Sequence, residues 1–119
     1  MSIEAKIKKS IVEFLRVLAD TTRLDILEIL KDNEMPASKI KERLGRSQST
    51  TSKHLNILVD NNLIDFERKN NIKYYKLKKN ININEFIAQI STFANTINKE
   101  KLKNIRDDIR DVDIIDTLS

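Results

Sequence analysis

The sequence predicts a mainly helical protein with one small β-hairpin. Its 119 residues include a single glycine and a single proline, whereas an all-β fold of this length needs many more turn residues. Apolar residues recur at spacings of three and four along most of the chain, as in amphipathic helices. Residues 63–78 differ, because side chains alternate there around an Asn-Asn pair. The length suits a single domain over residues 1–119.

Two helices are predicted at the start of the chain. The first covers 3–18, because one apolar stripe repeats at spacings of four, four, three and four: Ile3, Ile7, Ile11, Phe14 and Leu18. Asp20 or Thr21 can cap the second helix, whose wide apolar face ends near Lys31.

Two shorter helices with a tight turn between them are predicted next. Pro36 suits the start of a helix, and Gly45 suits the position after its end, where positive φ is needed. Ser47 or Ser49 can cap the helix that follows. Residues 37–60 therefore form a predicted helix–turn–helix.

A hairpin and a long helix complete the predicted fold. Residues 63–78 give two strands joined at Asn70-Asn71. Residues 84–112 give a helix with a coiled-coil-like apolar stripe that has one irregularity: Phe86, Ile90, Phe93 and Ile97, then Leu102, Ile105, Ile109 and Val112.

Charge is unevenly distributed along the chain. The net charge is +4, but residues 37–79 hold eleven Lys or Arg against four Asp or Glu, a net of +7. Basic charge concentrated in this way favours a polyanionic partner, although a solvated basic surface is the simpler alternative. No apolar run is long enough to cross a membrane, and no secretory signal is seen. The absence of cysteine fits a reducing compartment, so we expect a cytoplasmic protein.

The predicted helix after Gly45 has two different faces. At 100° per residue, Thr51, Leu55 and Leu58 fall within about 40° of one another and should face the core. The opposite face is short, polar and mildly basic, and Ser49, Ser52, Lys53 and Asn56 belong to it. A helix that enters the major groove of DNA needs small side chains that donate and accept hydrogen bonds. The following hairpin completes a winged helix, with cations near its tip.

The candidate DNA contacts come from the turn, the helix and the hairpin. They are Arg46, Gln48, Ser49, Thr50, Ser52, Lys53, His54, Asn56, Arg68, Lys69 and Lys73. His54 lies about 60° from the core direction, so it suits a phosphate contact and a structural role equally well. Arg23 is likewise either structural or directed at a phosphate.

Three motifs resemble the ArsR-type winged helix–turn–helix regulators. LADTTRLDILEIL at 18–30 is similar to a stretch of that family that usually has proline where Thr21 stands. MPASKIKERLGRSQSTTSKHLNILVDNNLI at 35–64 resembles its helix–turn–helix, although Arg46 replaces a usual apolar residue and Asn62 a usual glycine. ERKNNIKYYKL resembles its wing. The resemblance covers roughly residues 14–78 and implies a DNA-binding regulator.

The metal-sensing sites common in such regulators have no counterpart in this sequence. Where the resemblance implies a Cys-x-Cys pair, the chain has Pro36 and Ser38, and residues 80–119 contain no histidine. Without thiolates a soft-metal site of this kind is excluded, and we expect neither a metal nor a cofactor. An acidic cluster could collect a hard cation but better fits a solvated helix end: Asp107, Asp108, Asp111, Asp113 and Asp116.

The sequence therefore predicts a homodimeric, sequence-specific regulator of transcription, expected to be a repressor that binds a pseudo-palindromic site in double-stranded DNA. The dimer contacts are expected from the helices at 1–18 and 84–112, through Ile3, Ile7, Ile11, Phe86, Ile90, Phe93 and Ile97. The alternative is a winged-helix protein-interaction module in a larger nucleic-acid-associated complex, which should present apolar anchors on the outer helix face. An enzyme is not expected, because no Gly-rich phosphate loop, cysteine or catalytic triad is apparent.

Overall fold

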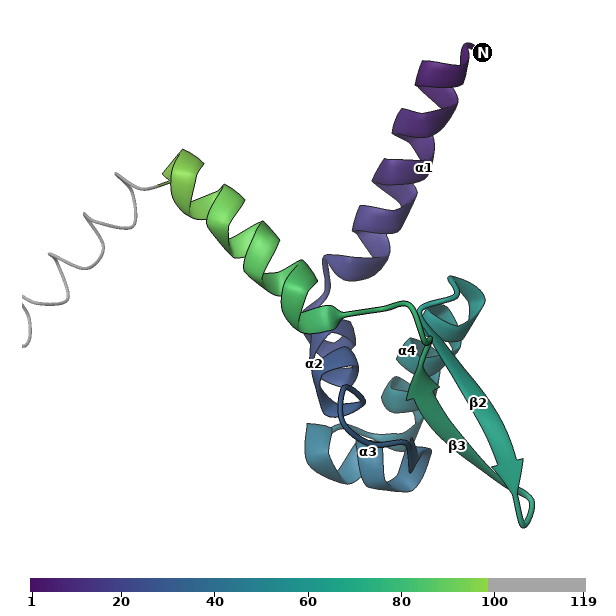
Figure 1. The fold of residues 1–119 in the computed structure, drawn as a ribbon. Coiled ribbons are helices and arrows are strands. Elements are labelled where there is room, and N and C mark those ends of the chain that lie inside the picture. The colour runs from purple at the N-terminus through teal and green to yellow at the C-terminus, as the bar shows by residue number, and fades with distance from the viewer. Residues whose placement is uncertain (99–119) are drawn as a thin grey trace, which may run out of the picture. The chain divides into compact units, whose positions relative to one another are not determined.

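The protein is mainly helical with a small antiparallel sheet, as predicted (Figure 1). The computed structural model describes residues 1–98. The chain divides into two compact units, Met1–Ile83 and Asn84–Ser119. The first unit contains the helix–turn–helix and the wing.

The first two helices begin at side-chain caps. Helix α1 spans Ile3–Leu18, and the Ser2 hydroxyl accepts a hydrogen bond from the Ala5 amide at 3.1 Å. Helix α2 spans Thr21–Ile29, and the Asp20 carboxylate accepts from the Arg23 amide at 3.0 Å. These caps satisfy amides that the first helical turn leaves unpaired. Of the α1 residues only Leu18 is buried, so most of the predicted apolar stripe of this helix lies on the surface.

The helix–turn–helix forms where the sequence predicts it. Helix α3 spans Ala37–Leu44 and ends at Gly45, whose φ of 65° is the left-handed conformation expected there. Helix α4 spans Gln48–Asp60, and Ser47 is its N-cap. The turn between the two helices is therefore three residues long.

The predicted hairpin is part of a three-stranded sheet. Strands β2 (Ile64–Lys69) and β3 (Ile72–Leu77) are joined by Asn70 and Asn71, both at positive φ, as a tight hairpin turn requires. A short strand β1 (Met35–Pro36) pairs with the other side of β3, which gives the order β1-β3-β2. The expectation of a hairpin alone was incomplete. Two residues cannot display a strand's alternating pattern, and only the tertiary fold brings β1 to the edge of β3.

The core of the first unit lies between α2, α3, α4 and the sheet. Its fully buried apolar side chains come from each of these elements: Ile26, Leu27, Ile40, Leu55, Leu58 and Ile64. Phe66 of β2 and Tyr75 of β3 face each other across the register, with ring centroids 5.8 Å apart. This core fixes which face of α4 remains outside.

The described part of the last helix covers residues 83–98, close to the predicted start at 84. Phe86 is half-buried, whereas Ile90, Phe93 and Ile97 are exposed. The predicted continuation to 112 and the acidic cluster at 107–116 lie outside the described residues. No helix among residues 1–98 has both the length and the apolar character that a membrane span requires.

Candidate nucleic-acid interface

Helix α4 presents a polar outer face, as the helical geometry predicts. Gln48, Ser49, Lys53 and Asn56 are exposed, and Ser52 is half-buried. The three residues expected to face the core are all buried: Thr51, Leu55 and Leu58. The outer face therefore carries amides, hydroxyls and one ammonium group, without a large apolar side chain among these positions.

Hydroxyl groups organise the N-terminus of α4. The Ser47 hydroxyl accepts from the Thr50 amide at 3.1 Å and donates to the Thr50 hydroxyl at 2.9 Å. The hydroxyls of Ser47 and Ser49 lie 3.3 Å apart, within hydrogen-bond distance. Ser and Thr at this end thus cap the helix and keep its first turn narrow.

A small hollow lies between α3 and α4. Its volume is about 130 Å³, and five of its six lining residues have a polar side chain: Ala37, Ser38, Lys41, Gln48, Thr51 and Ser52. Lys41 and Ser38 were not predicted as contacts. They belong to α3, and only the packing of the two helices places them beside the predicted residues of α4.

The wing carries the predicted cations, which differ in their surroundings. Arg68 is exposed and lies opposite Lys73 in the register. The Lys73 ammonium lies 4.4 Å from the centroid of the Phe66 ring. Lys69 forms an ion pair with Glu34, and this hydrogen bond raises the pKa of Lys69. Lys69 is therefore less available for another anion than Arg68.

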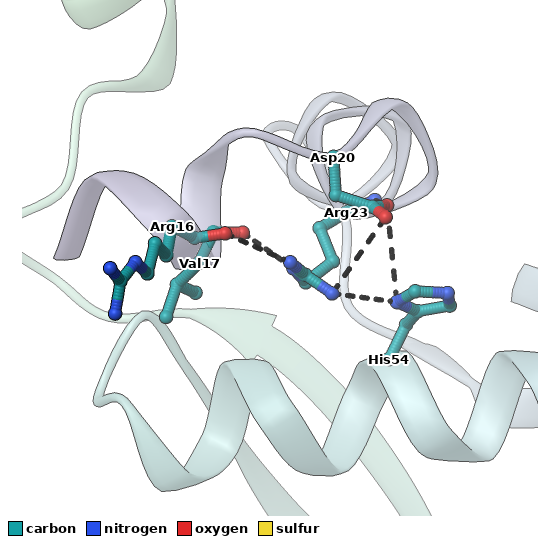
Figure 2. A network of polar contacts seen from close by, with 5 residues as sticks. All are labelled: Arg16, Val17, Asp20, Arg23 and His54. Atoms are coloured by element: carbon teal, nitrogen blue, oxygen red, sulfur yellow. Dashed lines mark hydrogen bonds and ion pairs between the residues drawn. The ribbon is translucent and has the colours of Figure 1, made fainter. Parts of the chain in front are cut away.

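His54 lies on the buried side of α4 and not on its outer face. The residue is 9% exposed, and its Nδ1 atom lies 3.1 Å from Arg23 Nη1 and 3.9 Å from Asp20 Oδ1 (Figure 2). Of the two roles left open for His54, its position fits the structural one. His54 points about 60° away from the core direction around the helix axis. It is nevertheless buried, because α2 packs against α4 on that side.

Arg23 links three elements of the first unit. Its Nε donates to the Val17 carbonyl and its Nη2 donates to the Arg16 carbonyl at 3.0 Å, so it caps the C-terminal end of α1 (Figure 2). Its Nη1 reaches His54 on α4. Arg23 is therefore structural, and the planar guanidinium is well suited to contact acceptors in several directions.

Asp20 completes this polar network from the N-terminus of α2. Burial tends to raise the pKa of the Asp20 carboxyl, but the Arg23 amide and the positive charge of Arg23 outweigh it and hold that pKa below its usual value. The carboxylate is thus charged at neutral pH beside Arg23, at 3.8 Å. Its neighbours are Arg23 and His54, and within residues 1–98 no group of three or more His, Asp or Glu side chains is arranged to hold a metal ion.

Comparison with known proteins places the fold among transcriptional regulators. The family model described as "Helix-turn-helix domain" matches residues 18–65. An arsenical resistance operon repressor of Staphylococcus aureus is 34% identical over 99 residues, which cover 82% of this chain and 93% of that protein. The transcriptional repressor SdpR of Bacillus subtilis is 36% identical over 84 residues, 71% of this chain and 89% of that protein.

A solved structure shares this fold. The crystal structure of NolR from Sinorhizobium fredii matches with a TM-score of 0.66 and 29% sequence identity, over 78% of this chain and 93% of that chain. The structure contains the helix–turn–helix and the wing that the sequence motifs predict. The matches to known proteins cover both of these elements. The chain belongs to the ArsR-type family of winged helix–turn–helix transcriptional regulators.

Proposed function

We propose that the protein is a homodimeric repressor that binds a specific site in double-stranded DNA through the outer face of α4. The observation that carries this proposal is the exposed, narrow and polar face of a helix that is otherwise part of the core. The two curated relatives from Staphylococcus aureus and Bacillus subtilis are repressors, which supports repression as the direction of control.

Residues at the front of α4 are proposed to contact bases. The Gln48 amide can donate and accept, which suits the two groups that adenine presents in the major groove. Ser49, Ser52 and Asn56 are short enough to let the backbone approach the base edges. Lys53 is an exposed point charge and suits a phosphate on the groove wall.

Cations around α4 are proposed to contact the phosphate backbone. Arg46 is exposed in the turn before α4, and Arg68 and Lys73 belong to the wing. The hollow between α3 and α4 offers Lys41 and hydroxyl groups to one further phosphate oxygen. Lys69 contributes less, because it is paired with Glu34.

Two copies of the chain are proposed to pair through the exposed apolar residues of α1 and of the last helix. Ile3, Ile7, Ile11 and Phe14 are exposed on α1, as are Ile90, Phe93 and Ile97 on residues 83–98. An exposed apolar stripe along a helix is typical of an interface, and each of these two helices carries one. A twofold dimer presents two copies of α4 about 34 Å apart, which requires a pseudo-palindromic site.

Selection of bound duplexes from a random pool by the purified protein tests this function. We expect the enriched sequences to share two inverted half-sites about 10 base pairs apart, centre to centre. On an enriched duplex, Gln48→Ala should relax the preference at one base pair in each half-site. Lys53→Ala should weaken binding to every duplex and lower the salt dependence.

The matched control is Lys9→Ala, which removes the same charge from an exposed position of α1 on the side opposite the apolar stripe. This variant should bind DNA as the unmodified protein does. Equal losses for Lys9→Ala and Lys53→Ala would contradict the assignment of α4 as the contact surface. Failure to bind any duplex at low ionic strength would contradict DNA binding itself and would favour a protein-interaction module.

A further inference from the structure

The hydrogen bond between Arg23 and His54 requires one particular protonation state of the histidine. A guanidinium group has only hydrogen-bond donors, so the atom it meets at 3.1 Å, His54 Nδ1, must be an acceptor. An imidazole that accepts at Nδ1 is neutral and carries its proton on Nε2. The hydrogen bond from Arg23 to His54 in Figure 2 therefore forms only while Nδ1 of His54 carries no proton.

A second proton on His54 would remove this contact. Two N–H groups, each on a cation, would then face each other across 3.1 Å. Asp20 is the one anion facing His54 among the described residues, at 3.9 Å, and it already accepts from the Arg23 amide and pairs with the Arg23 side chain. Elements α3 and β2 also pack against α4, but within residues 1–98 neither brings a charged group within ion-pair distance of His54.

The proposed DNA-contacting residues lie on the same turns of α4 as this contact. Lys53 precedes His54 directly, and Asn56 follows two residues later, both exposed. Arg23 in turn is fixed to the last carbonyls of α1. The Arg23–His54 contact therefore sets how α4 sits against α2 and the end of α1, and polar contacts to bases tolerate only small displacements.

We propose that His54 is a positioning residue for DNA binding, which holds α4 in place as a neutral acceptor for Arg23 and releases it when protonated, so that acidification weakens DNA binding. This inference rests on the proposed function. His54 is the only histidine of the chain, so an effect of imidazole protonation can come from no other side chain.

The test compares DNA affinity at about pH 7.5 and about pH 5.5, where imidazole changes its charge, by fluorescence anisotropy with a duplex enriched from the random pool. The variants are His54→Asn, whose amide oxygen can take the place of Nδ1 but does not titrate, and His54→Leu, which has no acceptor. The unmodified protein should lose about tenfold in affinity on acidification, as expected for one hydrogen bond to a charged group. His54→Asn should bind equally at both pH values, and His54→Leu should bind weakly at both.

Circular dichroism at both pH values verifies that each variant is folded, and His54→Gln replaces His54→Asn if the latter is not. A purely structural role for His54 predicts losses in all variants but no difference in pH dependence. Equal pH dependence in the unmodified protein and in His54→Asn overturns the proposal.

Nuclear magnetic resonance of the free protein separates this inference from the proposed function. Imidazole nitrogen shifts at neutral pH should report a proton on Nε2 and none on Nδ1. Acidification should shift the backbone amides of 52–56 in the unmodified protein but not in His54→Asn. A proton on Nδ1 at neutral pH, or equal amide shifts in both proteins, overturns the positioning role even if the protein binds no DNA. Absence of DNA binding at every pH, with the expected spectra, contradicts only the proposed function.

Discussion

The apolar stripe of α1 allows a quantitative test of dimerisation. Ile7 is 54% exposed and Ile11 is 51% exposed in the single chain. Complete burial of an Ile side chain stabilises by roughly 1.5–3 kcal/mol, so burial of the remaining half of each contributes about 1 kcal/mol. Replacement of both by Ser in a dimer affects four side chains and should cost about 4 kcal/mol of association free energy, equivalent to a dissociation constant about 10³-fold higher.

Sedimentation equilibrium measures this dissociation constant directly. Ser and Ile have similar intrinsic helix propensities, so α1 itself should persist in the variant. Val12→Ser is the matched control. Val12 is 45% exposed on the same helix, but it lies roughly 145° from the middle of the stripe. Association that is unchanged by the double substitution, or weakened as much by Val12→Ser, would refute pairing through this stripe.

Three further predictions concern stability and are tested by chemical denaturation. Gly45→Ala should destabilise by about 1 kcal/mol, because an added Cβ meets no atom of the described residues within 4 Å but positive φ strains any L-residue; no loss would contradict the left-handed cap. Thr51→Val should be neutral or stabilise by about 1 kcal/mol, since the buried hydroxyl has no hydrogen-bond partner among residues 1–98; a large loss would indicate a bound water. Asp20 has a lowered pKa in the folded state, so its contribution to stability is present above its unfolded pKa and lost as pH falls through the folded one. Asp20→Asn, which retains a capping side chain, should therefore lose less stability than the unmodified protein between about pH 4 and about pH 2, and an identical acid profile would contradict the shift.

The helices were predictable because their ends are specified locally. Asp20 and Ser47 each accept a hydrogen bond from the amide three residues later, and Gly45 adopts the positive φ that few other residues tolerate. The hairpin was predictable for the same reason, since Asn70 and Asn71 both adopt positive φ. In each case the determining contact spans only a few residues.

Other features depend on contacts between residues far apart in the sequence. Strand β1 forms because Met35 pairs with Tyr75 of β3. A strand of two residues has no sequence pattern from which this pairing could be predicted. Lys69 meets Glu34, which is 35 residues away, so a cation predicted for DNA is partly neutralised. The helical angle of His54 was compatible with either side of α4, and only the packing of α2 decides between them.

Two kinds of contact hold α4 in place, namely apolar packing on its inner face and a polar contact to α2. Thr51, Leu55 and Leu58 hold its inner face by apolar packing, which has no preferred direction along the helix axis. A directional contact is needed to fix the rotation and register of the helix, and His54 with Arg23 is the one that the structure provides on the α2 side. Arg23 can serve this purpose because its other donors are already fixed by the carbonyls at the end of α1. A lysine, with a single ammonium group, could not contact the two carbonyls and the imidazole from one plane. The polar network is therefore a better candidate than the apolar core for the element that sets the orientation of the DNA-contacting face.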